Sequence, residues 1–575
     1  MGLKLASTLA ITALFGLVYA LVFAVGIWFL GDLGIFGLLI MVGITLLIVL
    51  FQYGISPVFI KWTYKITWIP FEDYRAQYPH LGDVIDQVVQ VRRIKTPKVG
   101  IIYGELSPNA FTFGWTKNKA RVVLSEGILE YLSEEEQSAV LAHEMGHVVH
   151  SDFILMTVVF AIPLVLLTIG RWAFYTARFS SFRSRDDEGS IIYLALFAIA
   201  ILSYVSYYIG YLISLIVSRI REYYADSHAA EVLENPNALS TGLVKIAYGL
   251  LVEPAMITVQ QRNRSKMRGL RGLGIFDPNS ARGLVVSSIG SSGAYSKEAI
   301  QAAAAWDLFN PWAKYYQIFS THPLPAKRIQ RLNNQCDIYG LKPEIDFSKA
   351  REIKEEQAGK SMLDEFILDI TIKNLALFVF IAMGIFSILW IFGLAGFIGL
   401  TILPIVITTQ WLVLLWFGTF YLMGFAFLLR MSVQYKKGYE PRTVLDLVTN
   451  VKVSPIRCVP AYIEGTIIGR GVAGYYFSDD LYFKDETGIL YIDYSFGIRL
   501  VDWFFAITKV ERLIGQRVRI KGWYRRGPIP YLQVHSIETE SGRIFRNYKK
   551  QLTYLWAVLL FLIGALLFWV GIFVL

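Results

Sequence analysis

The pentapeptide His143-Glu144-Met145-Gly146-His147 places two histidines four residues apart with a glutamate between them. On a helix, both imidazoles then lie on one face. Two imidazoles at this spacing can bind one zinc ion and leave the carboxylate beside a water molecule on the metal. The pentapeptide therefore predicts a helix that carries a zinc hydrolase site, with His143 and His147 as metal ligands and Glu144 as general base.

The residues before the pentapeptide predict where this helix begins. Ser133 followed by Glu134, Glu135 and Glu136 has the capping-box pattern S-x-x-E. Three carboxylates in a first turn also suit the positive end of a helix dipole. Counted from Ser133, the pentapeptide lies about three turns into the helix.

The composition predicts a membrane protein. The chain has 575 residues, of which 55% are hydrophobic and only 17% charged, and its mean hydropathy is +0.47. These values are too apolar for an ordinary soluble protein, so the lipid bilayer is an expected partner. Cys336 and Cys458 have no C-x-x-C spacing and predict neither a disulfide framework nor a cysteine metal site.

Apolar runs predict about seven membrane spans. They occupy residues 5–30, 34–55, 153–169, 191–217, 375–429 and 552–575. The run at 375–429 is long enough for two spans and barely for three, which leaves the side of the following segment open. The first run is too long for a signal-peptide core and is followed directly by a second, so we expect a retained hairpin.

The distribution of Lys and Arg predicts the orientation. Segment 56–152 is rich in both, whereas the turn at 31–33 carries only Asp32. The positive-inside rule then places the pentapeptide on the cytoplasmic side of the cell membrane, although the arginines between residues 171 and 185 argue the other way. This bias accounts for the net charge of +10, so nucleic acid is not an expected partner.

A catalytic zinc site needs a third protein ligand, and Glu222 is the candidate. Glu222 and Asp226 are four residues apart, shortly after the fourth predicted span. A membrane hairpin would bring this helix beside the pentapeptide, so that Glu222 can bind zinc while Asp226 accepts the N–H of a ligating histidine. The alternative is a pair of solvated carboxylates. His150 fits the known zinc ligand sets less well.

Several motifs occur in a familiar order over residues 1–335. They are the first two spans, Pro108-Asn109-Ala110-Phe111, residues 123–129 (VLSEGIL), the zinc pentapeptide with Asp152, Glu222-Tyr223-Tyr224-Ala225-Asp226, and Ser320-Thr321-His322-Pro323 with Arg328. The chain thereby resembles the family of integral-membrane zinc metallopeptidases that includes the heat-shock protease HtpX and the CAAX prenyl protease.

The resemblance implies roles for particular residues. It implies one zinc ion per chain on His143, His147 and Glu222, with Glu144 as general base and Asp226 orienting a zinc histidine. It also implies a substrate strand added at Asn109 and Ala110, and an oxyanion contact from His322 supported by Arg328. The implied function is an endopeptidase that degrades misfolded or damaged membrane proteins from the cytoplasmic side. A CAAX-type prenyl peptide protease is the alternative within this class.

Beyond residue 335 the chain departs from that resemblance. The sequence predicts short strands between turn signals, at residues 462–468, 481–484, 489–494, 517–521 and 531–537. They predict a small barrel over 431–551 that resembles an OB-fold of the kind attached to membrane-protease partners such as NfeD. We expect it to dock a protein partner or substrate. The alternative from another functional class is a membrane scaffold or binding protein whose OB-like module binds a partner or nucleic acid and whose metal site is inactive or of narrow specificity.

The predicted fold class is a multi-span α-helical membrane protein with a cytoplasmic α+β catalytic domain of the zincin (gluzincin) type and a C-terminal OB-like β-barrel. In chain order, the expected parts are a membrane hairpin (1–55), the first catalytic part (56–152), a second hairpin (153–219), the second catalytic part (220–340), a linker (341–373), a membrane region of two spans (374–430), the barrel (431–551) and a last span (552–575).

Overall fold

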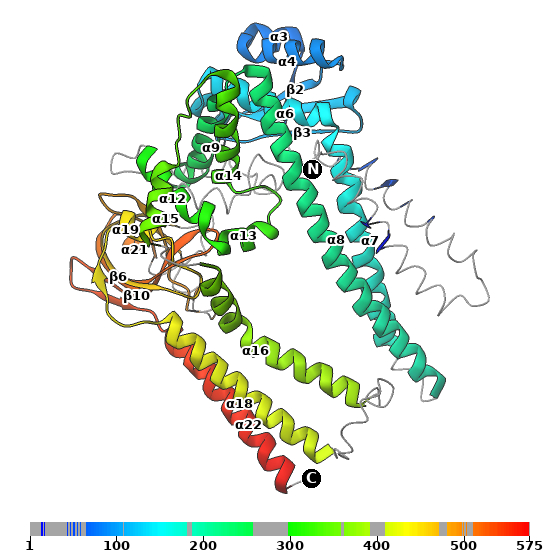
Figure 1. Ribbon diagram of the computed structural model, residues 1–575, viewed down its shortest axis with the longest axis vertical. Helices are drawn as coiled ribbons and strands as arrows, with labels where there is room; N and C mark the ends of the chain where they lie inside the picture. Colours follow the sequence, from blue (N-terminus) through cyan, green and yellow to red (C-terminus); the bar gives the residue numbers. More distant parts are fainter. Residues whose placement is uncertain are drawn as a thin grey trace. The chain divides into compact units, whose positions relative to one another are not determined.

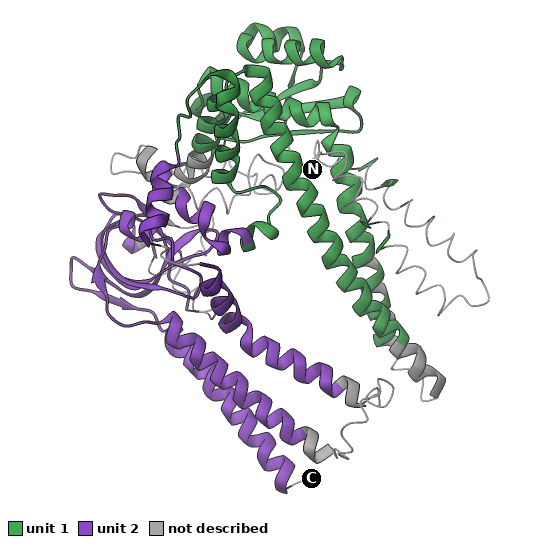
Figure 2. Cartoon of the chain, viewed as in Figure 1, with its two compact units in different colours: residues 1–253, 257–281, 315–346 green, residues 254–256, 282–314, 347–575 purple. Residues whose placement is uncertain are grey.

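The computed structural model describes residues 65–106, 108–180, 187–256, 297–357, 362–391, 409–470, 480–496 and 510–573, with isolated positions elsewhere. The predicted spans at 5–30 and 34–55 lie outside these ranges. The chain forms two compact units (Figure 2). Unit 1 holds residues 1–253, 257–281 and 315–346, and unit 2 holds residues 254–256, 282–314 and 347–575. The expected second catalytic part, 220–340, is therefore divided, because residues 282–314 group with the barrel.

Unit 1 contains a four-stranded sheet. Its strands are β1 (Thr67–Ile69), β2 (Lys98–Ile102), β3 (Ala110–Gly114) and β4 (Ala120–Ser125), in the order β1-β2-β4-β3. β2 and β4 are parallel, and β3 runs antiparallel to β4 at the edge of the sheet. Phe111 and Phe113 of β3 pack with Ile102 and Val123 in a buried cluster on one face. Strand alternation puts Thr112 on the opposite face.

Helix α6 (Glu134–His150) carries the pentapeptide and begins where the sequence predicts. The Ser133 hydroxyl accepts a hydrogen bond from the Glu136 amide, and the Glu136 carboxylate accepts one from the Ser133 amide at 2.8 Å. Such a cap stabilises a helix by about 1 kcal/mol. The neighbouring helices of unit 1 are α3 (Phe71–Gln77), α4 (Pro79–Arg92), α5 (Glu126–Tyr131), α9 (Pro236–Met256) and α14 (Pro325–Cys336).

Two long helices, α7 (Asp152–Ser180) and α8 (Asp187–Leu233), lie side by side (Figure 1). Apolar side chains including Val159, Leu166 and Val217 pack between them, and the Ser214 hydroxyl donates to the Val159 carbonyl at 2.8 Å. A bilayer needs only about 20 helical residues, so α8 with its 47 residues continues well past a span. Glu222 thus belongs to the same helix as the membrane segment.

Unit 2 contains three more helices long and apolar enough to cross a membrane: α16 (Met362–Ile391), α18 (Thr409–Gln434) and α22 (Lys549–Phe573). With α7 and α8 they make five candidate spans among the described residues, which supports a multi-pass membrane protein. The stretch 375–429 thus contains parts of two such helices, while residues 392–408 lie outside the description. α16 begins at Met362, and α15 (Ser348–Gln357) precedes it, so the expected linker 341–373 is largely helical.

Five strands of unit 2 close into a barrel. They are β6 (Val459–Arg470), β7 (Leu481–Lys484), β8 (Ile489–Asp493), β9 (Arg517–Arg526) and β10 (Pro530–Thr539). The ring runs β6-β7-β8-β10-β9 and returns to β6, with β8 and β10 parallel. Short strands β5 (Glu440–Pro441) and β11 (Ile544–Arg546) extend it. The predicted small barrel is confirmed.

Helix α12 (Lys297–Phe309) and the residue after it pack within unit 2, because their side chains bind the segment before the barrel. Trp306 Nε1 donates to the Val453 carbonyl at 2.8 Å, and Asn310 Nδ2 donates to the Val451 carbonyl at 2.7 Å. A buried ion pair joins Asp307 to Arg526 of β9 at 3.3 Å. These contacts explain why residues 297–314 do not group with unit 1. The remaining short helices are α13 (Pro311–Ile318), α19 (Val444–Val448) and α21 (Val510–Leu513).

Candidate metal centre

Helices α6 and α8 approach closely at Gly146, inside the pentapeptide. A Cβ added to Gly146 would lie 3.1 Å from the Ala225 Cα and 3.2 Å from the His228 side chain. A side chain at this position would be tightly crowded, so glycine favours the close approach of the two backbones. The close approach of α6 and α8 at Gly146 therefore places His143 and His147 near Glu222.

Both imidazoles point one nitrogen at the same carboxylate. His143 Nε2 lies 3.6 Å from Glu222 Oε2, and His147 Nε2 lies 3.8 Å from Glu222 Oε1. His143 and Glu222 are fully buried, and among the described residues His143 Nε2 and Glu222 Oε2 have no hydrogen-bond partner. Ligand atoms on a tetrahedral zinc ion are roughly 3.4 Å apart. Two nitrogens and one carboxylate at these separations fit a metal ion held among them.

The other nitrogen of each ring contacts a second carboxylate. His143 Nδ1 lies 3.0 Å from Asp226 Oδ1, and His147 Nδ1 lies 2.7 Å from Asp152 Oδ2. A carboxylate on Nδ1 fixes the ring and the tautomer that leaves Nε2 free for a metal. Asp226 lies where the sequence predicts. No role was predicted for Asp152, which α7 places at its first residue.

Burial and neighbouring charge affect the two histidines differently. Burial, together with the charge of Arg221, lowers the pKa of His147 to about 3. Burial also acts to lower the pKa of His143, but the carboxylates of Asp226 and Glu222 outweigh it and raise that pKa to about 9. At neutral pH His147 is thus already in the neutral form that a metal requires, whereas metal binding at His143 releases a proton.

Glu144 is held by the edge strand. The Thr112 hydroxyl donates to Glu144 Oε2 at 2.7 Å. Glu144 also lies close to the two histidines, and one ligand atom from each of the three residues falls within 4.8 Å of the others. Because Glu222 faces both Nε2 atoms while Glu144 is tied to Thr112, Glu222 fits the third ligand position better and Glu144 fits a position beside the metal.

His322 joins the same cluster. Its Nδ1 lies 3.2 Å from Glu222 Oε2. The loop that carries it is fixed by Arg219 of α8, whose guanidinium donates to the carbonyls of Gln317, Ile318 and Ser320 at 2.8, 3.1 and 2.8 Å. One helix thus supplies Glu222 and also holds the loop of His322, a link that sequence reasoning missed.

Arg328 lies beside two buried carboxylates of α8. Its side chain is fully buried, and it donates to both oxygens of Asp226 at 2.9 and 2.6 Å. Its Nη1 also lies 3.8 Å from Glu222 Oε2. The expected role of Arg328 at the substrate, as support for the oxyanion contact of His322, stays a prediction. In this position Arg328 balances the charge of two buried carboxylates.

The register of β3 shows which backbone groups face its open side. The Ser125 amide donates to the Asn109 carbonyl at 2.9 Å, so Asn109 directs its backbone to β4. In an antiparallel pair these bonds alternate, which turns the amides and carbonyls of Ala110, Thr112 and Gly114 away from β4. In the described part of the chain no strand pairs with that side. Ala110 therefore offers backbone groups at the edge, and Asn109 does not.

Comparison with known proteins gives the family. The profile of peptidase family M48 matches residues 75–335, which include every residue of the cluster above. A protease HtpX homolog of Methanothermobacter thermautotrophicus is 38% identical over 271 residues, and the match covers 47% of this chain and 93% of that relative. The chain belongs to peptidase family M48.

Further comparisons each cover about half of the chain. A protease HtpX homolog of Thermoplasma acidophilum is 29% identical over 341 residues, which cover 57% of this chain and 96% of that relative. The crystal structure of S. mikatae Ste24p is similar at 18% identity and a TM-score of 0.29, over 51% of this chain and 57% of that one. That structural similarity is too low to support an inference. The barrel lies beyond the segment that the M48 profile matches.

Proposed function

We propose that this M48 protein is a zinc endopeptidase in which His143, His147 and Glu222 hold one zinc ion. The observation that carries the proposal is the convergence of both Nε2 atoms on one buried carboxylate, with each Nδ1 against a further carboxylate. Imidazole nitrogen and carboxylate oxygen are zinc ligands, and three protein ligands leave a fourth position open for catalysis. In a structural zinc site, protein ligands would occupy all four positions.

Glu144 is assigned the proton transfers. A zinc ion in this site would act as a Lewis acid and lower the pKa of water from about 15.7 towards 7. The Thr112 hydroxyl occupies Glu144 Oε2, so Oε1 accepts the proton of the attacking water and passes it to the leaving amine. His322, whose Nδ1 lies 3.2 Å from Glu222 Oε2, is assigned the hydrogen bond to the developing oxyanion.

The substrate is assigned to the open edge of β3. An extended peptide can pair with the outward amides and carbonyls of Ala110 and Thr112, while the Thr112 side chain contacts Glu144. Main-chain bonds of this kind do not depend on substrate side chains, so broad specificity follows. We therefore propose degradation of misfolded or damaged membrane proteins. The Lys and Arg distribution supports the cytoplasmic side of the cell membrane.

The barrel is assigned a docking role for a protein partner or substrate. It follows α18 directly and leads into α22, so both of its connections are candidate membrane spans. A module held in this way stays near membrane proteins that the protease would cleave. Neither the net charge nor the position of the barrel indicates nucleic-acid binding.

Zinc content and casein cleavage test the proposal in detergent-purified protein. Glu144→Gln should retain about one zinc ion per chain and lose cleavage, because the carboxylate base is absent while the three ligands remain. Glu135→Gln, an exposed position on the same helix, is the matched control and should behave as the parent. Undiminished cleavage by Glu144→Gln would exclude the assigned base. Zinc without cleavage in the parent would favour the scaffold alternative, and preference for prenylated over unmodified peptides would favour the CAAX-type alternative.

A further inference from the structure

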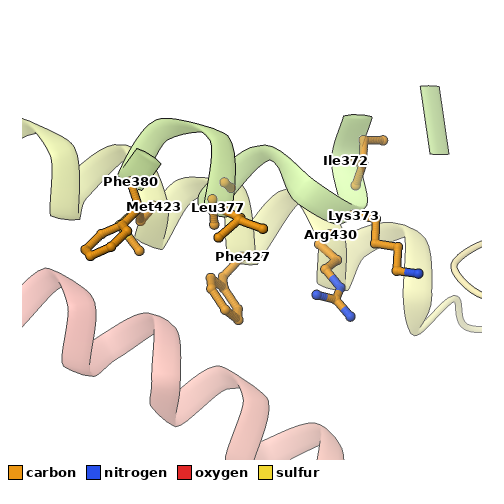
Figure 3. A pocket seen from close by; sticks show the side chains of 9 residues that line it. Ile372, Lys373, Leu377, Phe380, Met423, Phe427 and Arg430 are labelled. Carbon is orange, nitrogen blue, oxygen red and sulfur yellow. The ribbon is translucent and has the colours of Figure 1, made fainter. Parts of the chain in front are cut away.

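A groove of about 350 Å³ lies between α16 and α18 in unit 2. Figure 3 shows Leu377 and Phe380 on the α16 wall and Met423 and Phe427 on the α18 wall. At one end of the groove Lys373 and Arg430 join Ile372 in the lining. The groove thus has an apolar body and a cationic end. Its volume is within the range of small-ligand sites.

The cationic end coincides with the boundary of both spans. Arg430 belongs to the last turns of α18, which ends at Gln434 before the chain enters the barrel region. Lys373 is the last cation of α16 before an apolar run that begins at Leu375. The turns of α16 before Lys373 pair with a residue outside the spans, because Arg457 lies 3.0 Å from Glu365 and 3.2 Å from Asp369. Both cations therefore lie at the level where hydrocarbon gives way to headgroups.

An aromatic ring holds Lys373, and partial burial limits the exposure of Arg430 to solvent. Lys373 Nζ lies 5.1 Å from the centroid of the buried Trp312 ring, which is a cation–π contact. Arg430 is half-buried, and in the part of the chain that the structure describes no carboxylate forms an ion pair with it. Two neighbouring cations repel each other in a region of reduced dielectric. An anion between them would relieve that repulsion.

We propose that this groove binds one anionic phospholipid of the surrounding bilayer. One acyl chain lies between the apolar walls, and the phosphate contacts Lys373 and Arg430. The charge of the groove decides the occupant, because zwitterionic lipids offer the same acyl chains without the net negative charge that matches two cations. Basic pockets between spans bind anionic headgroups on these terms. The proposal is independent of the metal centre.

Native mass spectrometry of the full-length, detergent-purified protein tests this site. The protein is titrated with phosphatidylglycerol and with phosphatidylcholine of identical acyl chains, and the dissociation constant of the first bound lipid is measured. We expect phosphatidylglycerol to bind roughly tenfold more tightly in the parent, from the attraction of two cations. The double variant Lys373→Gln/Arg430→Gln should lose this preference.

The matched control is Lys436→Gln/Lys437→Gln, which removes the same charge from exposed positions just after α18. It should keep the preference of the parent. Three outcomes would overturn the proposal: no preference in the parent, an unchanged preference in the groove variant, or an equal loss in the control, which would mean that only general juxtamembrane charge matters.

A second measurement uses only the parent protein, so it tests the site even where the groove variant fails to fold. A photoactivatable phosphatidylglycerol is cross-linked to the parent, and the labelled peptides are mapped. Labels on residues 372–380 and 423–430 that excess phosphatidylglycerol removes and excess phosphatidylcholine does not would support the site. Labels confined to other helices would contradict it.

Discussion

The guanidinium of Arg328 binds both carboxylate oxygens of Asp226, at 2.9 and 2.6 Å, and Asp226 in turn lies 3.0 Å from His143 Nδ1. A fully buried cation of α14 thus supports a candidate metal ligand of α6 through Asp226. Arg328 is far from Asp226 and His143 in the sequence, so local spacing does not predict this supporting role.

Replacement of Arg328 should therefore affect the fold before it affects substrate binding. Arg328→Gln leaves two buried carboxylates without their cation, and breaking such a buried pair costs about 3–5 kcal/mol. Chemical denaturation should show this loss together with a lower zinc content. Arg331→Gln, at an exposed position of the same helix, is the control; it removes a cation–π contact with Tyr223 at 4.8 Å and should cost about 1 kcal/mol at most. A stable Arg328→Gln protein with only a raised KM would restore the substrate-contact interpretation.

Removal of Asp152 should weaken zinc binding without removing a ligand. The carboxylate lies 2.7 Å from His147 Nδ1, and loss of such a partner typically lowers metal affinity about 10–100-fold. Competition with a chromogenic chelator would measure the change in Asp152→Ala. Asp152→Asn should lose less, since the amide oxygen can still accept the Nδ1 proton. Equal affinity in the parent and Asp152→Ala would show that the carboxylate does not orient the ring.

Gly146 should tolerate no side chain. In Gly146→Ala the new methyl group meets the Ala225 Cα at 3.1 Å, which pushes α6 away from α8 and costs roughly 1–3 kcal/mol. Because Glu222 belongs to α8, its carboxylate would also move away from both imidazoles, and zinc content should fall with stability. Gly384→Ala in α16 is the control, since nothing lies within 4 Å of its added Cβ. Parent-like zinc content in Gly146→Ala would mean that the helices can separate without disturbing the site.

The hydrogen bond from Thr112 should matter for turnover more than for zinc. Thr112→Val removes the donor to Glu144 Oε2, and a hydrogen bond to a charged group contributes about 1.5–3 kcal/mol, which corresponds to at least a tenfold fall in kcat. Zinc content should stay at the parent level. Thr112→Ser keeps the hydroxyl and should restore most of the activity. Failure of serine to restore activity would point to the shape of the side chain rather than to the bond.

The sequence predicted those parts of the site that depend on local spacing. The i, i+4 histidines, the capping box at Ser133 and the pair Glu222 and Asp226 each lie within one helix, where a fixed periodicity decides the facing side. Contacts across elements were not predictable in this way. Thr112, Asp152 and Arg219 act through distances set by how β3, α7 and the loop before α14 pack against α6 and α8, and no local pattern encodes those distances.

The same limit applies to the division into units. The barrel strands follow from alternation and turns, so their positions agree closely with the prediction. The assignment of residues 282–314 to the barrel unit follows from tertiary contacts instead, such as the buried pair of Asp307 and Arg526. The family resemblance covers residues 1–335 without interruption, so it did not predict that residues 282–314 group with unit 2.

The register of β3 predicts opposite effects for two neighbouring proline substitutions. Ala110→Pro removes an amide that faces the open edge, so the ladder with β4 stays intact and stability should change little. A substrate strand would lose one main-chain bond, and KM for casein should rise. Phe111→Pro removes an amide that faces β4 and should lower the melting temperature by several degrees. If Ala110→Pro destabilises the protein as much as Phe111→Pro and leaves KM unchanged, the substrate does not pair with this edge.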